Sequence, residues 1–344
     1  MTPTAPPRPA ELFSVGPTTA ELFIDGEVVV LEGLEPSSEH LVEGIAFSTL
    51  EDIGEVRSTI ATMNDVHFGE EVCGRVAGVE GSGISLPAGQ PPYPVVMNEA
   101  VVAEAAMTTP SLVVVKGDLT DEGRPSEIAA FRQLYRGTFG TRLLYVRGNH
   151  DCYEGSQYAD WPVQVSDLDG ARVVVLDTAR RFTVGGTLDA AQIDAVDALA
   201  QSTTLPVLLF GHHPLSTPEH PLTPANSIDE HAGALLLECL GRHDNLIAYL
   251  AGHTHRCRRQ VHRGTDLIEV ACVKDFPGAW AQYLIGTKGI TQVLHRARRP
   301  DAVAWAEQTR HLFDGYYGAY ALGELSDRSF LLGGPTASTT SRRG

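Results

Sequence analysis

Residues 143–151 read LLYVRGNHD, an apolar run that reaches a glycine and then presents an amide, an imidazole and a carboxylate in succession. The apolar run is typical of a buried strand. A strand that only fills a core does not normally end in three such side chains. The stretch therefore predicts a strand whose carboxyl end performs chemistry, through Asn149, His150 and Asp151.

The same pattern, an apolar run followed by polar side chains, recurs in four other places. The runs TIATM, LVVVKG, PVLLFG and IAYLAG are followed by the other members of the set: Asp65 and His67, Asp118, His212 and His213, and His253 and His255. Amphipathic stretches such as SEIAAFRQLYRG, residues 126–137, lie between several of these runs. This alternation predicts an α/β fold whose strands are buried on both faces. Ligands bind at the carboxyl ends of the strands in such sheets, so we expect the polar residues to share one edge.

The chain around this core divides into several predicted segments. Residues 1–19 are rich in proline and alanine and are predicted to be a disordered tail. Residues 20–56 contain short, half-apolar runs broken by turns, so we expect a small β-rich N-terminal extension. Residues 57–330 form the predicted main domain, and residues 331–344 a second disordered tail. Inside the main domain, residues 68–94 are rich in glycine and proline and predict a long loop inserted at the site.

Charge and cysteine content restrict the class of protein. The formal net charge of -17 argues against duplex nucleic acid or an anionic membrane as a partner, because both attract positive surfaces. An anionic substrate would then need a local positive centre, for which a metal ion is the obvious candidate. The five cysteines form no CxxC pair, so neither a disulfide framework nor a thiolate zinc site is indicated. No signal peptide or membrane span is recognisable, and we expect a cytoplasmic protein.

The residue types at the strand ends predict a site for two metal ions. Carboxylate, imidazole and amide groups suit Mn²⁺, iron, Zn²⁺ or Mg²⁺, whereas a soft metal would need thiolates. Two ions that share one carboxylate need about seven protein ligands. The sequence offers seven, namely Asp65, His67, Asp118, Asn149, His212, His253 and His255. Asp118 can bridge the ions with its two oxygens, and the neutral Asn149 limits negative charge beside an anionic substrate. Glycines at 117, 148, 211 and 252 are expected to let the backbone turn sharply at the rim.

The five blocks resemble, in order, the pattern D-x-H … G-D … G-N-H-[DE] … H … G-H-x-H of the calcineurin-like metallophosphoesterase superfamily. The resemblance spans residues 65–255, which is most of the chain. It implies a four-layer αββα sandwich with a dinuclear metal centre. Carried over by position, it assigns one metal to Asp65, His67, Asp118 and His255, and the other to Asp118, Asn149, His212 and His253.

The resemblance also implies how the opening stretch acts. A hydroxide that bridges the two metals attacks phosphorus in line. His150 faces the substrate and protonates the leaving oxygen or stabilises developing charge. Asp151 holds the imidazole of His150 in position and raises its basicity. Asn149 serves as a ligand and also lies beside the bound substrate.

Within the superfamily, the chain is most similar to the class III cyclic-nucleotide phosphodiesterases and their bacterial relatives. The stretches GHHP, LAGHTH and GDLTDEGRPSEIAAFRQLY carry this similarity. His213, which follows the ligand His212, would either donate to the substrate phosphate or pack and fix His212. The 68–94 loop is longer than expected for that subfamily and could roof the pocket and change which ester fits. The expected substrate is therefore a small phosphodiester, with a 3′,5′-cyclic nucleotide as a hypothesis.

Other functions remain open at this stage. A phosphomonoesterase or phosphatase, acting on a small metabolite or a protein, would use the same metals but needs a grip for a dianion. Only Arg147 and Arg256 flank the motifs as candidates for that grip. A nuclease is disfavoured by the charge. A catalytically silent scaffold would normally have lost ligands, and none is missing. The aromatic residues of 313–330 would pack across a sheet edge or form the interface of a homodimer.

Overall fold

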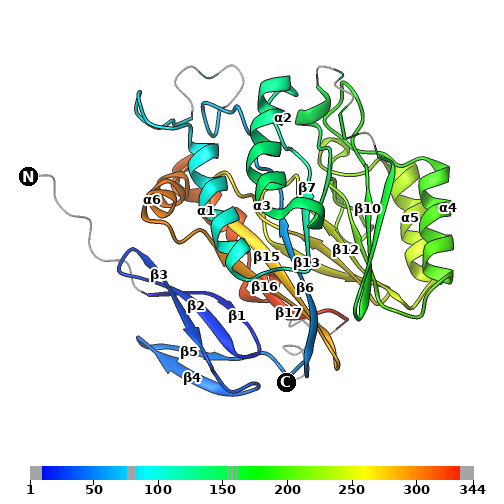
Figure 1. The fold of residues 1–344 in the computed structure, drawn as a ribbon, viewed down its shortest axis with the longest axis horizontal. Helices are drawn as coiled ribbons and strands as arrows, with labels where there is room; N and C mark the ends of the chain where they lie inside the picture. The colour runs from blue at the N-terminus through cyan, green and yellow to red at the C-terminus, as the bar shows by residue number, and fades with distance from the viewer. Residues whose placement is uncertain are drawn as a thin grey trace, which may run out of the picture.

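Two six-stranded β-sheets face each other in the computed structural model, which describes residues 10–75, 79, 83–153, 155, 158–159 and 161–333 (Figure 1). The first sheet has the order β17-β16-β15-β6-β7-β8 and the second the order β13-β14-β12-β11-β10-β9. The strands of the first sheet are β6 (Val56–Met63), β7 (Leu112–Lys116), β8 (Leu143–Val146), β15 (Ala279–Gly286), β16 (Ile290–Arg296) and β17 (Ser329–Leu331). Those of the second are β9 (Val163–Leu168), β10 (Ala171–Leu176), β11 (Val207–Phe210), β12 (Leu246–Ala251), β13 (Arg258–His262) and β14 (Thr265–Glu269).

Each sheet combines a run of parallel strands with antiparallel strands. Strands β6, β7 and β8 run parallel, as do β10, β11, β12 and β14. Strand β15 pairs antiparallel with β6, and β9 and β13 close the second sheet in the same way. All the strands that precede the predicted polar blocks lie in the parallel parts, so their carboxyl ends collect at one edge.

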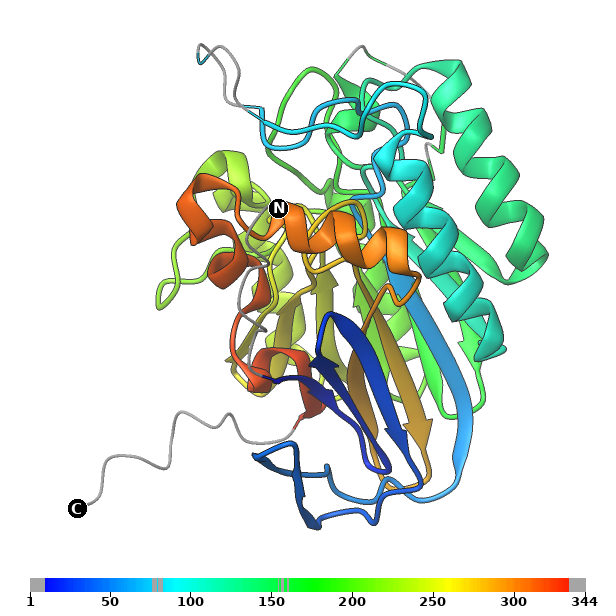
Figure 2. The ribbon, with the colours of Figure 1, turned by 90° about the vertical axis from the view of Figure 1, so that its left-hand side faces the viewer.

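Helices cover the outer face of each sheet, as Figures 1 and 2 show. Helices α1 (Tyr93–Met107), α2 (Pro125–Phe131) and α6 (Pro300–Thr309) pack on the first sheet. Helices α4 (Ala190–Gln201) and α5 (Glu230–Arg242) pack on the second. The N-terminal caps of α4 and α5 are the aspartates Asp189 and Asp229, whose carboxylates each accept the backbone N–H of the third residue of the helix. The predicted four-layer αββα sandwich is therefore confirmed.

The alternation of side chains along the strands explains why four layers form. In β7, Val113 and Val115 pack with α1, while Val114 faces the second sheet. In β10, Val174 packs under α4 and α5, while Val173 faces the first sheet. Strands that are apolar on both faces must be covered on both, which is why the sequence shows continuous apolar runs.

A small β-module precedes the sandwich. Strands β1 (Glu11–Val15), β2 (Thr19–Ile24) and β3 (Glu27–Glu32) form an antiparallel sheet, and β4 (Glu39–Val42) pairs with β5 (Ile45–Ser48). Strand β1 lies inside residues 1–19, so the predicted disordered tail is wrong for this stretch. The N–H of Val15 donates to Ser329 Oγ at 2.9 Å, which ties β1 to the sandwich. Residues 1–9, and residues 334–344 of the predicted C-terminal tail, lie outside the described part.

The remaining short elements connect these layers. They are η1 (Arg132–Arg136), α3 (Gly137–Phe139), η2 (Gly140–Arg142), η3 (His150–Cys152), η4 (Pro224–Asn226), η5 (Phe313–Gly315), α7 (Tyr316–Leu322) and α8 (Leu325–Arg328). The aromatic stretch 313–330 packs against the chain itself: the hydroxyl of Tyr320 donates to the carbonyl of Thr254 at 2.9 Å. The homodimer stays a prediction. Within the described ranges, no helix combines the length and the apolar composition that crossing a bilayer requires.

Candidate metal centre

The seven predicted ligands all follow the carboxyl ends of parallel strands. In the first sheet, β6 is followed by Asp65 and His67, β7 by Asp118 and β8 by Asn149. In the second sheet, β11 is followed by His212, and β12 by His253 and His255. The two sheets therefore contribute from opposite sides to one place between their edges.

One group of ligand atoms belongs to Asp65, His67, Asp118 and His255, and these atoms all lie within 4.8 Å of one another. Nε2 of His255 is 3.4 Å from Oδ1 of Asp65. Nε2 of His67 is 3.4 Å from Oδ2 of Asp118. These are the four residues that the resemblance to the family assigns to the first metal, and the structure brings them together.

A second group adjoins the first through Asp118. Nε2 of His212 lies 3.4 Å from Oδ2 of Asp118 and 3.0 Å from Oδ1 of Asn149. The ring centroids of His212 and His253 are 5.0 Å apart. The Asp118 carboxylate thus faces a histidine of each group, which is the position that a bridging ligand requires.

The hydrogen bonds around the two groups leave atoms that fit a cation. Nδ1 of His212 donates to the carbonyl of Lys116 at 2.8 Å, so Nε2 is the nitrogen that faces Asp118 and Asn149 and that offers a lone pair once its proton is displaced. Nε2 of His253 donates in the same way to the carbonyl of Ala225, at 2.8 Å, which leaves the lone pair on Nδ1. His67 is buried, and among the described residues neither of its ring nitrogens has a hydrogen-bond partner. Lone pairs of buried nitrogen and oxygen atoms that converge in this way suit a hard or intermediate metal ion.

The backbone at the ligands is strained. Five of the seven residues have a positive φ between 47° and 68°: Asp65, His67, Asp118, His253 and His255. This conformation costs an L-residue roughly 1–2 kcal/mol, although Asp tolerates it better than most residues. The loops hold it by main-chain hydrogen bonds, such as His67 N to Asp118 O at 2.9 Å. Backbone strain that is concentrated on one set of residues is typical of a functional site.

The electrostatics of the cluster favour ionised carboxylates. Burial opposes ionisation of Asp118, but the imidazoles of His212 and His150 outweigh burial and lower the pKa of Asp118 well below its usual range. Burial would likewise lower the pKa of His212, but the Asp118 and Asp65 carboxylates raise this pKa to about 9. Burial also opposes ionisation of Asp65, but the imidazoles of His255 and His212 outweigh burial and lower its pKa, so the carboxylates of Asp65 and Asp118 are both in the form that binds metal.

His150 lies beside the cluster, held by a neighbour that the sequence analysis missed. Its Nδ1 is 2.7 Å from the carbonyl oxygen of Asp121, so Nδ1 donates and Nε2 remains available to a ligand. Its backbone N–H donates to Oδ1 of Asp118 at 2.9 Å. The pKa of His150 rises to about 9, because the carboxylates of Asp118 and Asp121 outweigh the effect of burial. The contact with Asp121 uses a main-chain carbonyl, which no side-chain pattern reveals.

The role predicted for Asp151 needs correction. Its carboxylate does not hold the imidazole of His150; it accepts the backbone N–H groups of Gly148 at 2.7 Å, Leu119 at 3.0 Å and Thr120 at 2.9 Å. Burial, with help from the nearby Asp118, raises the pKa of Asp151 to about 6 despite these donors. Asp151 therefore ties the loop after β8 to the loop after β7. The side chain turns away from His150 because the orphan N–H groups of two tight loops need an acceptor.

The role in substrate binding predicted for His213 is also corrected. The side chain is fully buried. Nδ1 lies 2.9 Å from Thr178 Oγ1, and Nε2 donates to the carbonyl of Val184 at 2.9 Å. Both nitrogens are occupied, so of the two roles left open by the sequence the structure supports packing: the ring stands edge-on to that of His212 at a centroid distance of 4.7 Å.

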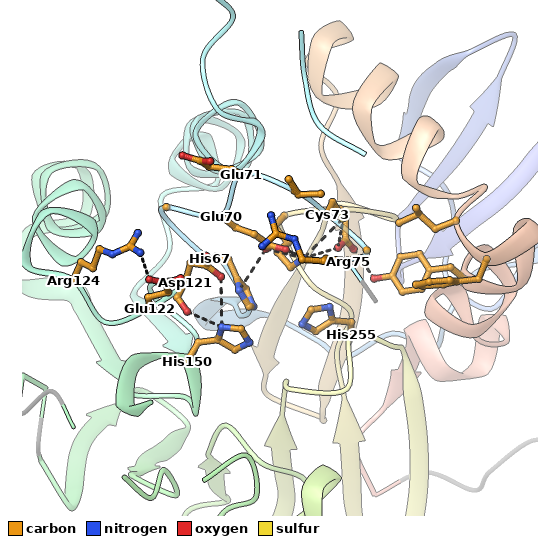
Figure 3. Close-up of a pocket in the computed structure, with 18 residues that line it drawn as sticks. His67, Glu70, Glu71, Cys73, Arg75, Asp121, Glu122, Arg124, His150 and His255 are labelled. Carbon is orange, nitrogen blue, oxygen red and sulfur yellow. Dashed lines mark hydrogen bonds and ion pairs between the residues drawn. The ribbon is translucent and has the colours of Figure 1, made fainter. Parts of the chain in front are cut away.

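A cavity of about 530 Å³ opens beside the metal-ligand groups. Figure 3 shows His67, His150 and His255 close together at this cavity, with Glu70, Cys73 and Arg75 on the side of the inserted loop. Its far wall comes from the C-terminal part of the chain, through Lys274, Asp275, Leu312, Phe313 and Tyr317. The sequence analysis missed this wall, because these residues follow no motif and lie outside the strand-end pattern.

Comparisons with known proteins agree with this geometry. Residues 58–257 match the family model described as calcineurin-like phosphoesterase. A "Probable cyclic nucleotide phosphodiesterase" of Synechococcus is 27% identical over 164 residues, which cover 46% of this chain and 62% of that protein. The 3′,5′-cyclic adenosine monophosphate phosphodiesterase of Pseudomonas aeruginosa is 30% identical over 168 residues, which cover 46% of this chain and 60% of that protein. The match therefore spans about three fifths of the length of each of these relatives.

The fold has a counterpart among solved structures. A dimetal phosphatase from Danio rerio superposes with a TM-score of 0.52 at 16% identity, covering 71% of this chain and 98% of that one. At that identity the likeness concerns the fold alone. The family match includes the whole set of strand-end ligands from Asp65 to His255. The chain belongs to the calcineurin-like phosphoesterase family.

Proposed function

We propose that the protein is a metal-dependent phosphodiesterase that hydrolyses a small phosphodiester, with a 3′,5′-cyclic nucleotide as the leading candidate. The observation that carries the proposal is that seven metal-ligand side chains converge beside a cavity of about 530 Å³. They form two groups, and the Asp118 carboxylate faces a histidine of each group. Cavities of roughly 300–1,000 Å³ are typical of small-molecule sites. A cavity walled by the inserted loop and the C-terminal segment favours a small ester over a protein or a nucleic-acid strand.

The charges of the cavity favour a diester over a monoester. Lys274 is paired with Glu70 at 2.9 Å and with Asp275 at 3.0 Å, and Arg124 is paired with Glu122 and Glu127. Arg75 is the third basic residue of the lining, against five acidic ones: Glu70, Glu71, Asp121, Glu122 and Asp275. A monoester dianion is best held by charge-assisted contacts to free cations. A diester carries one negative charge and suits this lining better.

The residues divide into metal ligands and one acid. Asp65, His67, Asp118 and His255 would hold one metal ion, and Asp118, Asn149, His212 and His253 the other. Such ions, drawn from Mn²⁺, iron, Zn²⁺ and Mg²⁺, supply Lewis-acid stabilisation and an activated water. His150 keeps its Nδ1 on the carbonyl of Asp121, so its Nε2 is the nitrogen that can donate a proton to the leaving oxygen.

Two further points support the choice of substrate and compartment. Both relatives described above carry names of cyclic-nucleotide phosphodiesterases. A cyclic nucleotide is a monoanionic diester, which agrees with the charges of the cavity lining. The five cysteines are all free and buried, which suits a reducing compartment such as the cytoplasm.

The test is hydrolysis by metal-stripped protein after Mn²⁺ is added back, with bis(p-nitrophenyl) phosphate, p-nitrophenyl phosphate and 3′,5′-cyclic AMP as substrates. We expect diester turnover that exceeds monoester turnover and falls by at least about 100-fold in Asp118→Asn. His231→Ala, which alters an exposed histidine of α5, is the control and should leave turnover unchanged. Faster turnover of the monoester would replace this proposal with a phosphomonoesterase. Turnover of bis(p-nitrophenyl) phosphate without cyclic AMP would keep the phosphodiesterase and remove the cyclic nucleotide.

A further inference from the structure

His67 lies between two carboxylates, one on each ring nitrogen. Nε2 faces Oδ2 of Asp118 at 3.4 Å, and Nδ1 faces Oε2 of Glu70 at 3.5 Å. The ring is 2% exposed, and neither nitrogen makes a hydrogen bond to any residue that the structure describes. Glu70 belongs to the inserted loop and to none of the five motif blocks.

We propose that Glu70 is the positioning residue of the first metal ligand set, where it accepts the Nδ1 proton of His67. This bond would fix the tautomer in which Nε2 carries the lone pair toward Asp118, the side on which the first ion is held. The proposal rests on the metal centre of the proposed function. An imidazole ligand needs its second nitrogen oriented by an acceptor, and a carboxylate makes the ligand nitrogen more basic. Shortening the Nδ1–Glu70 contact by a few tenths of an ångström completes the bond.

Glu70 is held in place by a buried cation. Nζ of Lys274 lies 2.9 Å from Oε2 and 3.1 Å from Oε1 of Glu70. The same Nζ lies 3.0 Å from Oδ2 of Asp275. Asp275 in turn accepts the hydroxyl of Tyr317 in α7 at 2.5 Å and the thiol of Cys272 at 2.7 Å. The carbonyl of Lys274 accepts the indole N–H of Trp305 in α6 at 3.0 Å.

This chain of contacts joins the metal site to the part of the sequence that the family match does not include. The match ends at residue 257, whereas Lys274, Asp275 and Tyr317 lie beyond it. The C-terminal segment would therefore set the geometry of His67 through Glu70, besides forming the far wall of the cavity. The inserted loop is fastened at a second point, where Cys73 Sγ donates to Asp275 Oδ2 at 3.3 Å.

A purely structural role for Glu70 is the competing explanation. Glu70 would then only neutralise Lys274, a task that Asp275 already shares. In that case, loss of the Glu70 carboxylate lowers stability and leaves metal affinity unchanged once the protein is folded. Metal affinity and the melting temperature of the metal-free protein therefore separate the two roles.

The experiment uses the full chain with Glu70→Ala, Glu70→Gln and the control Glu71→Ala. Glu71 is the next residue of the same loop and lines the same cavity. Mn²⁺ affinity is measured by competition with a chelating dye, and melting is measured without metal. We expect Glu70→Ala to weaken the affected Mn²⁺ site by about 10–100-fold, because the orienting acceptor is lost. Glu70→Gln keeps an acceptor oxygen without the charge and should recover part of the affinity, and Glu71→Ala should match the unaltered protein.

Equal Mn²⁺ affinity in Glu70→Ala and Glu71→Ala would overturn the proposal. The absence of Mn²⁺ binding by the unaltered protein would overturn it as well. Failure of the proposed function is distinguishable, since it concerns turnover: a protein that hydrolyses none of the esters yet loses affinity in Glu70→Ala keeps the positioning role. A variant that melts lower but binds Mn²⁺ normally assigns Glu70 to structure alone.

Discussion

Two of the glycines beside the metal ligands serve different purposes. The sequence predicts that they let the backbone turn, and Gly117, with φ of 89°, does so. Gly148 does not have a positive φ; it provides space, because a Cβ built there would overlap the carboxylate and the N–H of Asp118. Besides Gly117, five of the ligands themselves have a left-handed backbone, among them Asp65 and His67.

Gly148→Ala should therefore damage the metal centre far more than the fold. The added methyl group must displace Asp118, which faces both ligand groups. We expect Mn²⁺ affinity to fall by at least about 100-fold, which corresponds to roughly 2.7 kcal/mol. Calorimetric titration with Mn²⁺ measures this loss. Gly137→Ala in α3 is the control, because nothing lies within 4 Å of a Cβ there, and an unchanged affinity in both variants would show that Asp118 adapts without cost.

Asp151→Ala tests the corrected role of this buried carboxylate. The change removes the acceptor of three backbone N–H groups, from Gly148, Leu119 and Thr120. Buried donors left without partners cost about 1–3 kcal/mol each, so we expect the free energy of unfolding of the metal-free protein to fall by about 3–5 kcal/mol. Urea denaturation measures it. Unchanged stability with a large loss of turnover would restore the role predicted from sequence, the orientation of His150.

The sequence identifies ligands more reliably than it identifies hydrogen-bond partners. Asp118 and His255 were predicted from residue type and position after a strand, and the structure brings them together with the other ligands. Two of the three backbone partners of Asp151 lie 31 and 32 residues earlier, in the loop after β7. The partners of His213 are the side chain of Thr178 and the main chain of Val184, in a third segment. Such pairings depend on which loop tips meet, and this follows from the assembled sheets.

The parallel strands of the two sheets could be predicted, whereas β1 could not. The parallel strands are continuous apolar runs, which is the pattern of strands buried on both faces. They can therefore be recognised from the local sequence alone. Strand β1 follows a proline-rich stretch, and its conformation depends on pairing with β2 and on distant contacts. Nε of Arg328 donates to the carbonyl of Phe13 at 2.7 Å, and Arg310 pairs with Glu11 at 2.8 Å. The strand is thus defined by residues about 300 positions away.

Arg328→Ala should loosen the N-terminal module and spare the metal centre. The guanidinium is buried and also donates to the carbonyls of Leu322 at 2.9 Å and Gly323 at 2.8 Å, so it joins β1 to the end of α7. Hydrogen bonds from a charged donor contribute about 1.5–3 kcal/mol each and are not additive, so we expect a loss of about 3–5 kcal/mol in the free energy of unfolding.

Chemical denaturation measures the loss in Arg328→Ala, and Mn²⁺ titration should show an unchanged affinity. The matched control is Arg57→Ala, whose side chain is 47% exposed and pairs with the exposed Asp169 at 3.9 Å. Surface changes of this kind stay within about 0.5 kcal/mol. Equal stability of the two variants would mean that the N-terminal module contributes nothing to folding through this contact.

The whole molecule places its metal centre where the two sheets meet. The first sheet delivers Asp65, His67, Asp118 and Asn149, and the second delivers His212, His253 and His255. Spacing along the chain predicts that these residues share an edge, and the resemblance to a known family predicts two facing sheets. Neither predicts the far wall, because Lys274 reaches the cavity only after β14, and Phe313 only after the chain has passed through β15, β16 and α6 as well.

Removal of the metal ions should therefore loosen the contact between the sheets. Ions held by ligands of both sheets cross-link them, and they also oppose the repulsion within a chain of net charge -17. A site with free metal at 100 times its dissociation constant stabilises the folded state by about 2.7 kcal/mol, so two independent sites contribute about 5 kcal/mol. We expect the chelated protein to melt several degrees below the Mn²⁺-loaded protein, as calorimetry would show.

Hydrogen exchange locates this effect. Mn²⁺ should slow the exchange of backbone amides in both the 64–68 loop of the first sheet and the 252–256 loop of the second. Asp118→Asn should abolish this joint effect, because the carboxylate that both ligand groups share is lost. Protection that rises in the first loop alone would mean that only the first ligand set binds an ion. Equal melting with and without Mn²⁺ would mean that the sheets are held together by their apolar core alone, with a metal centre that contributes nothing to it.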